Sequence, residues 1–253
     1  MTVWRTTVAA GLFASGLAAA EPLPSGTSFL RDSLKAQQDD EAANPGMLWV
    51  SEGADLWRAE VGAARKSCAT CHKDVASSMR GAATRFPMVD QKSGRLLNLE
   101  GRINLCRTKH QKVEPFAYES DELLGLTAFV ARQSYGMAMN VATDGAARPF
   151  LERGKAFFNR RQGQLNLACR HCHVDNAGRR LRGDTISHGI GTGYPVYRLE
   201  WQSMGSLHRR LRSCSYGVRA IRFLPGSQEY LELELYLAKR AQGVKIDTPA
   251  IRP

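Results

Sequence analysis

Two five-residue segments of this chain combine two cysteines and a histidine at one spacing, Cys68-Ala-Thr-Cys71-His72 and Cys169-Arg-His-Cys172-His173. Two thiols separated by two residues can bond to the two vinyl groups of one porphyrin, while the next histidine ligates its iron. The spacing therefore predicts two haem c groups, each attached by both cysteines of a segment and ligated by its histidine. Zinc is the alternative, but the pairs lie 101 positions apart, whereas zinc-binding pairs lie roughly 15–20 residues apart.

The N-terminal segment has the pattern of a secretory signal. Arg5 is followed by a run of small and apolar residues, Val8 to Ala20, which ends in three alanines before Glu21. This pattern predicts a signal peptide over residues 1–20, cleaved near Ala20. The apolar run is shorter than the ~20 residues that span a bilayer, so we expect a periplasmic protein without a membrane span. Haem c is attached outside the cytoplasm in bacteria, which agrees with export.

The chain is basic, with 35 Lys and Arg against 24 Asp and Glu and a formal net charge of +11. An exported protein without a nucleic-acid recognition motif is not expected to bind nucleic acid. A basic surface in this setting favours a small anionic substrate or an acidic protein partner.

The chain reads as two copies of one plan: a helix, a haem segment, a long irregular stretch, a lone cysteine and a closing helix. Apolar spacing predicts helices over 55–65, 119–132, 149–160 and 228–241. The order resembles class I cytochrome c. We therefore expect a mainly α fold of two tandem class I cytochrome c-like domains with much irregular structure. Residues 21–147 would hold the first haem, and residues 148–253 the second haem and the active site.

Each iron needs a sixth ligand, and two cysteines remain after four are used for attachment. Cys106 and Cys214 follow their haem segments at similar distances and each precedes a closing helix. A disulfide between them is possible in an oxidising compartment. Their equivalent positions in two domains argue instead that each faces its own haem. Other candidates, each as readily explained as core or surface residues, are Met79, Met88, Met137, Met139, His110, Met204, His188 and His208.

The sequence around the two lone cysteines resembles the SoxA subunit of SoxAX cytochromes, in its dihaem branch. The similar segments are Ile103-Asn104-Leu105-Cys106-Arg107 and the stretch from Arg209 to Arg219, which contains Cys-Ser-Tyr-Gly-Val-Arg. Both haem segments and both lone cysteines occur in family order, and the resemblance covers most of the mature chain.

This resemblance implies a role for each site residue. His72 and Cys106 would ligate the first iron, and His173 and Cys214 the second. Cys214 would carry a persulfide at the active site. Arg210 matches a family active-site arginine, and its permanently charged, planar guanidinium suits the thiosulfate dianion. Its neighbours Arg209, Arg212 and Arg219 have the same chemistry, so only the resemblance singles out Arg210.

The family activity is that of an L-cysteine S-thiosulfotransferase, which joins thiosulfate oxidatively to a cysteine of the carrier protein SoxYZ. The resemblance also implies a SoxX-like monohaem cytochrome as partner and electron acceptor. Two alternatives stay open: a dihaem thiosulfate dehydrogenase that forms tetrathionate, and a noncatalytic dihaem electron carrier. A dihaem peroxidase is disfavoured because peroxide needs an open iron site, and both irons have a cysteine candidate.

Overall fold

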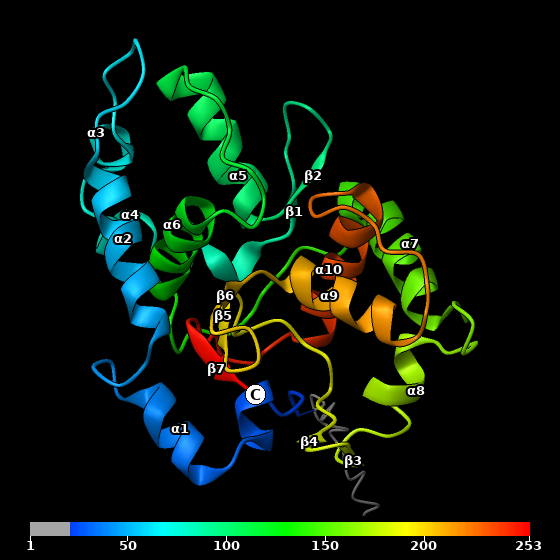
Figure 1. Cartoon of the computed structure of the whole chain (residues 1–253). Helices are drawn as coiled ribbons and strands as arrows, with labels where there is room; N and C mark the ends of the chain where they lie inside the picture. Colours follow the sequence, from blue (N-terminus) through cyan, green and yellow to red (C-terminus); the bar gives the residue numbers. More distant parts are fainter. Residues whose placement is uncertain (1–20) are drawn as a thin grey trace, which may run out of the picture.

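The computed structural model describes residues 21–253, which form a mainly helical protein with short strands (Figure 1). The helices of the first half are α1 (Asp32–Asp39), α2 (Gly46–Arg58), α3 (Cys68–His72), α4 (Val75–Ser78), α5 (Leu99–Cys106) and α6 (Asp121–Arg132). Those of the second half are α7 (Arg148–Asn159), α8 (Cys169–His173), α9 (Leu207–Gly217) and α10 (Gln228–Arg240). The strands are β1 (Met88–Val89), β2 (Leu96–Leu97), β3 (Arg180–Leu181), β4 (Asp184–Thr185), β5 (Val196–Arg198), β6 (Ser203–Gly205) and β7 (Ala250–Arg252).

Three of the four predicted helices are confirmed as α6, α7 and α10. The prediction over 55–65 is wrong in its bounds, because α2 begins at Gly46 and ends at Arg58. The chain turns after α2 at Gly62, whose φ of 66° is left-handed, and no helix continues through that conformation. The predicted signal peptide lies outside the described residues. Within residues 21–253, no helix has the length and apolar character to cross a membrane.

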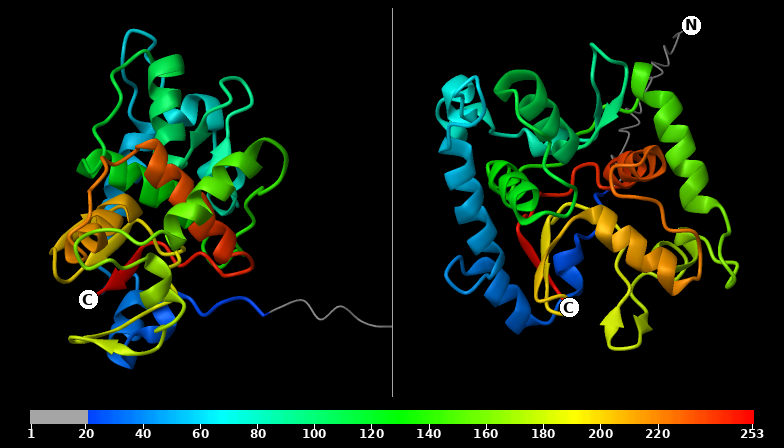
Figure 2. Two further views of the ribbon diagram at one scale, coloured as in Figure 1. Left: turned by 90° about the vertical axis from the view of Figure 1, so that its right-hand side faces the viewer. Right: turned by 45° about the horizontal axis from the view of Figure 1, so that its top comes forward.

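Two crossed helix pairs form the framework, with α2 packed on α6 and α7 packed on α10. The pairs lie on opposite sides of the molecule, and the three-stranded sheet of β5, β6 and β7 lies between them (Figures 1 and 2). Each crossing is closest at a glycine. A Cβ on Gly53 would lie 2.1 Å from the carbonyl oxygen of Gly125, and one on Gly154 would lie 1.9 Å from that of Glu232.

The two halves share a continuous core. One hydrophobic cluster combines Leu96 and Val141 of the first half with Leu231 and Leu235 of α10. An isolated bridge joins the segment before α7 to the segment after α10, at Ala138 and Lys245. The halves are therefore packed together over apolar surface, which is the dominant stabilising contribution in such an interface.

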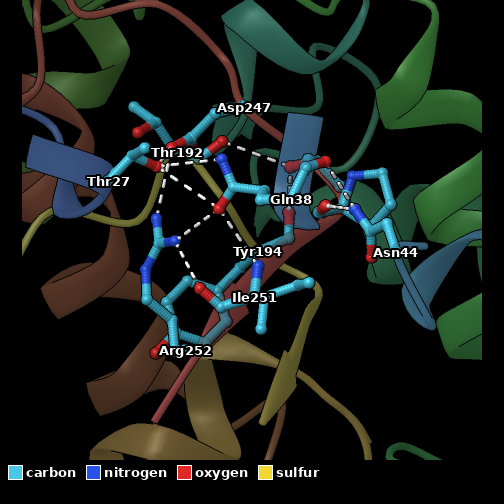
Figure 3. A network of polar contacts seen from close by, with 10 residues as sticks. Thr27, Gln38, Asn44, Thr192, Tyr194, Asp247, Ile251 and Arg252 are labelled. Atoms are coloured by element: carbon cyan, nitrogen blue, oxygen red, sulfur yellow. Dashed lines mark hydrogen bonds and ion pairs between the residues drawn. The ribbon is translucent and has the colours of Figure 1, made fainter. Parts of the chain in front are cut away.

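A buried polar network ties the N-terminal helix to the C-terminal strand (Figure 3). The side-chain oxygen of Gln38, on α1, accepts hydrogen bonds from the backbone N–H of Ile251 (3.1 Å) and from Arg252 Nη1 (2.8 Å). Asn44 Nδ2 donates to the carbonyl oxygens of Gln38 (3.1 Å) and Pro249 (2.9 Å). These bonds hold β7 in place beside β5, with which it pairs in parallel.

Candidate functional site

Each haem segment forms a single helical turn, α3 or α8, after a short reversal of the chain. Isolated bridges, Val61 to Lys66 and Gln162 to Leu167, close the two reversals. A local hydrogen bond starts each turn: the Thr70 N–H donates to Ser67 Oγ (3.0 Å) in the first, and the Ala168 N–H donates to the His171 ring (2.9 Å) in the second. Both thiols and the histidine of each segment thus lie on one turn, as covalent attachment to one porphyrin requires.

A hydrogen bond to the backbone fixes the orientation of the His173 ring. Its Nδ1 lies 2.8 Å from the carbonyl oxygen of Ser187, which accepts the proton on that nitrogen. The other nitrogen, Nε2, is then the unprotonated one that can ligate a metal. Gly189 packs against the same ring, and a Cβ there would lie 2.7 Å from His173 Cγ. A larger residue at position 189 would displace the histidine.

Helix α9 places Cys214 against His173. Burial raises the pKa of the Cys214 thiol, but the hydrogen bond with His173 and the charges of Arg210, His173 and Arg198 outweigh this and lower it to about 7. A thiol with this pKa is substantially ionised near neutral pH and is a strong nucleophile and metal ligand. The structure therefore brings together the two predicted ligands of the second iron.

Arg210 lies one helical turn before Cys214 on α9, so both side chains emerge on the same face. The Cys214 thiolate raises the pKa of Arg210, against the effect of burial. Within residues 21–253, no carboxylate lies within ion-pair distance of the Arg210 guanidinium. This charge is free to bind an anion beside the sulfur.

The first site is more exposed. His72 is exposed, and its ring lies 5.6 Å from that of Trp57. Cys106 ends α5 near the attachment cysteines: burial raises the pKa of Cys68 to about 11, and the neighbouring charge of Cys106 adds to the rise. Burial also raises the pKa of Cys106, which the charge of Arg102 partly offsets. This environment stabilises a thiolate less than that of Cys214.

The donor set fits haem c and not a bare metal ion. In the described part of the chain, no three His, Cys, Asp or Glu side chains are grouped as around a metal ion. All six cysteines are free, so Cys106 and Cys214 do not form the disulfide considered above. The attachment thiol Cys169 packs in a cluster of apolar side chains that includes Phe157, Leu211 and Phe223, suitable for a porphyrin face.

Three of the alternative candidates for the sixth iron ligand have other roles in the structure. Met139 and Met204 are buried in hydrophobic clusters. His208 is buried, with Nε2 2.9 Å from a carboxylate oxygen of Glu234. The sequence analysis did not identify Ser187, Tyr194 or Arg198. Ser187 orients His173 through its carbonyl oxygen, Tyr194 affects the pKa of Arg210, and the charge of Arg198 lowers the pKa of Cys214. A residue-by-residue alignment of the two halves would have drawn attention to the last two.

Two helical turns with the Cys-x-x-Cys-His sequence in a mainly helical fold, and in the second half a histidine that contacts a cysteine, are the features of a c-type cytochrome. In agreement, the family described as SoxA/TsdA, cytochrome c domain matches residues 52–139. The L-cysteine S-thiosulfotransferase subunit SoxA of Pseudaminobacter salicylatoxidans is 38% identical over 229 residues, which cover 90% of this chain and 80% of that protein. That of Paracoccus pantotrophus is 37% identical over 228 residues, covering 90% and 78%.

The solved crystal structure of SoxXA from P. pantotrophus contains a chain 37% identical to this one. It superposes with a TM-score of 0.88 and covers 91% of this chain and 87% of that chain. The chain belongs to the SoxA family, as its cysteine segments predicted.

Proposed function

We propose that this protein is an L-cysteine S-thiosulfotransferase subunit that joins thiosulfate to a cysteine of a SoxYZ-like carrier protein. The observation that carries the proposal is the second site: a thiol of lowered pKa, Cys214, against an oriented histidine, with an unpaired arginine one turn away. Similarity to SoxA proteins over nine-tenths of the chain supports the same activity.

The reaction releases two electrons. Thiosulfate dianion and a carrier thiol form one new sulfur–sulfur bond, and the products are the carrier S-thiosulfonate, one proton and two electrons. A bound haem c supplies a one-electron acceptor, so a second acceptor is required. We propose that a SoxX-like monohaem cytochrome provides it, which the likeness to a chain of SoxXA supports. An exported, periplasmic location follows from the N-terminal pattern and from haem c attachment.

The residues of this chain bind and orient the sulfur atoms. Arg210 would hold the thiosulfate dianion through its guanidinium fork. Cys214 would carry the reacting sulfur as a persulfide, and the charges that lower its thiol pKa would also stabilise a persulfide anion. Ser187 would keep His173 in the tautomer that ligates iron.

Two haems are proposed, one for each half. Cys68 and Cys71 would attach the first, with His72 and Cys106 as its axial ligands. In the second half the attachment residues would be Cys169 and Cys172, with His173 and Cys214 as axial ligands.

Carrier modification tests the proposal. Purified holoprotein with its partner cytochrome, an electron acceptor, thiosulfate and carrier should increase the carrier mass by one thiosulfate. Cys214→Ser should abolish this increase, whereas Ser213→Ala, a neighbour on α9 whose hydroxyl bonds only the backbone of Arg209, should keep it. Intact mass of the wild-type chain should show two haems and one reducible extra sulfur on Cys214. Carrier-independent tetrathionate formation would instead establish the dehydrogenase.

A further inference from the structure

Around their lone cysteines the two halves have equivalent elements at a constant offset of 108 positions, as from Cys106 to Cys214. Hairpin β1–β2 pairs Met88 with Leu97, and hairpin β5–β6 pairs Val196 with Gly205, in the same register. The next residue in each half caps the helix that follows. Asn98 accepts a hydrogen bond from the N–H of Gly101 at the start of α5, and Ser206 accepts one from the N–H of Arg209 at the start of α9.

This offset makes Arg102 the counterpart of Arg210, each four residues before its cysteine. In the first half Arg102 is not free. Its Nη2 lies 3.0 Å from the carboxylate of Asp90, a buried residue directly after β1 that also accepts a hydrogen bond from the Ser93 hydroxyl. The arginine charge of the first site is therefore neutralised within the protein.

The counterpart of Asp90 in the second half is Arg198, so one charge is reversed at an equivalent position. Arg198 is only 6% exposed. Its Nη2 lies 3.2 Å from the exposed carboxylate of Glu200, but its buried Nε has no hydrogen-bond partner among the described residues. Because Asp90 contacts Arg102 in the first half and the two hairpins share one register, Arg198 lies on the side of its strand that faces Arg210. In agreement, burial and then the charge of Arg210 lower the pKa of Arg198.

A buried guanidinium group and a half-buried one in the same site repel each other, and an unpaired buried N–H group costs free energy. A bound dianion removes both penalties, because it supplies two negative charges and several acceptor oxygens. Arg210 lies one helical turn before Cys214 on α9, so an anion bound to Arg210 would lie near the sulfur.

Position 194 supports the same conclusion. Tyr194 is the counterpart of Phe86, so the second site gains a hydroxyl that the first lacks. Burial raises the pKa of this phenol, while the charges of Arg210 and Arg198 oppose the rise. The Tyr194 hydroxyl therefore stays protonated and can donate a hydrogen bond.

We propose that Arg198 is a second substrate-binding residue, which together with Arg210 holds the sulfonate group of thiosulfate beside Cys214. The inference rests on the proposed function, because it assigns an additional residue to the same site. The first half, with Asp90 in this position, would bind no anion even though it has the same fold and an equivalent arginine.

Thiosulfate binding to the holoprotein with its partner cytochrome tests this assignment. In titration calorimetry at low ionic strength, Arg198→Gln should weaken thiosulfate binding about tenfold or more, the loss expected for one charged hydrogen-bonded contact. Arg198→Lys should restore part of the affinity by keeping the charge. The exposed Arg219→Gln removes the same charge outside the site and should bind thiosulfate as the wild type does. Haem absorption and thermal midpoint confirm folding of each variant.

Carrier conjugation then separates a binding role from a structural one. Arg198→Gln should raise the KM for thiosulfate and should reduce competitive inhibition by sulfate. A folded Arg198→Gln protein with wild-type thiosulfate affinity would overturn the inference and leave the proposed function intact. Failure of the wild type to modify the carrier would overturn the proposed function, and the calorimetric comparison would still decide whether Arg198 binds the anion.

Discussion

Gly154→Ala should destabilise the second half through a steric clash at the crossing of α7 and α10. The new Cβ would lie 1.9 Å from the carbonyl oxygen of Glu232 and 2.5 Å from its carbon. Ordinary contact begins at about 3.4 Å, so the helices must separate by roughly 1.5 Å. The obstructing atoms are backbone, and no change of side-chain rotamer can relieve the contact.

The size of the effect is a balance of two terms. Overpacking of a close contact costs about 1–3 kcal/mol, and more where the backbone must move. Alanine in a helix interior recovers about 1 kcal/mol relative to glycine. With the clash at the upper end of its range, the net loss is roughly 2 kcal/mol. For a chain of this size that corresponds to a decrease of about 4–8 °C in the midpoint of thermal unfolding.

Thermal unfolding of the holoprotein by far-ultraviolet circular dichroism measures this loss. The matched control is Gly217→Ala at the end of α9, where a Cβ would meet no atom within 4 Å. We expect the control midpoint to stay within about 1 °C of the wild type, in the range of most surface substitutions. A Gly154→Ala midpoint as close to the wild type as that of the control would refute the crossing argument.

Three further predictions concern pH, the polar network and the first haem. Burial and the charge of Glu234 raise the pKa of Glu100 from 4.5 to about 8, so the folded state holds more protons than the unfolded state between these values. Stability should fall as pH rises through this window, and Glu100→Gln should lessen the fall in thermal midpoint from pH 5 to pH 8. Gln38→Leu leaves the N–H of Ile251 without its acceptor, and should lower the unfolding free energy in urea by about 1–3 kcal/mol. Cys106→Met replaces an anionic axial ligand by a neutral one and should raise the reduction potential of the first haem in a spectroelectrochemical titration; an unchanged potential would contradict thiolate ligation.

Hydrophobic periodicity predicted the helices whose buried faces are apolar. Helix α6 buries Leu123, Leu126 and Val130, and the sequence shows this spacing directly. The N-terminal part of α2 was missed for a physical reason. Its closest contact is made by Gly53, and a residue without a side chain adds nothing to an apolar pattern. The short hairpins were also missed, because two-residue strands such as β1 have no detectable period.

The covalent chemistry of the site could be predicted because it requires residues adjacent in sequence. Arg210 was assigned as an anion-binding residue through the family resemblance, but Arg198 was not found, because its role depends on distant segments meeting in space. Arg198 ends β5 and Arg210 is on α9, and apolar periodicity gives no indication that these two segments pack together. Ser187 contributes a backbone carbonyl, which any residue type could supply.

The duplicated fold separates what stabilises the protein from what makes one half reactive. Both helix crossings have a glycine at the contact, and both hairpins have the same register, so packing permits little variation at these positions. The two halves differ at the position two residues after the first residue of each hairpin, which is Asp90 in the first half and Arg198 in the second. Asp90 there closes an ion pair with Arg102. Arg198 there adds a second positive charge to the site, which its exposed ion-pair partner Glu200 balances only in part, and the proposed anionic substrate would complete the balance.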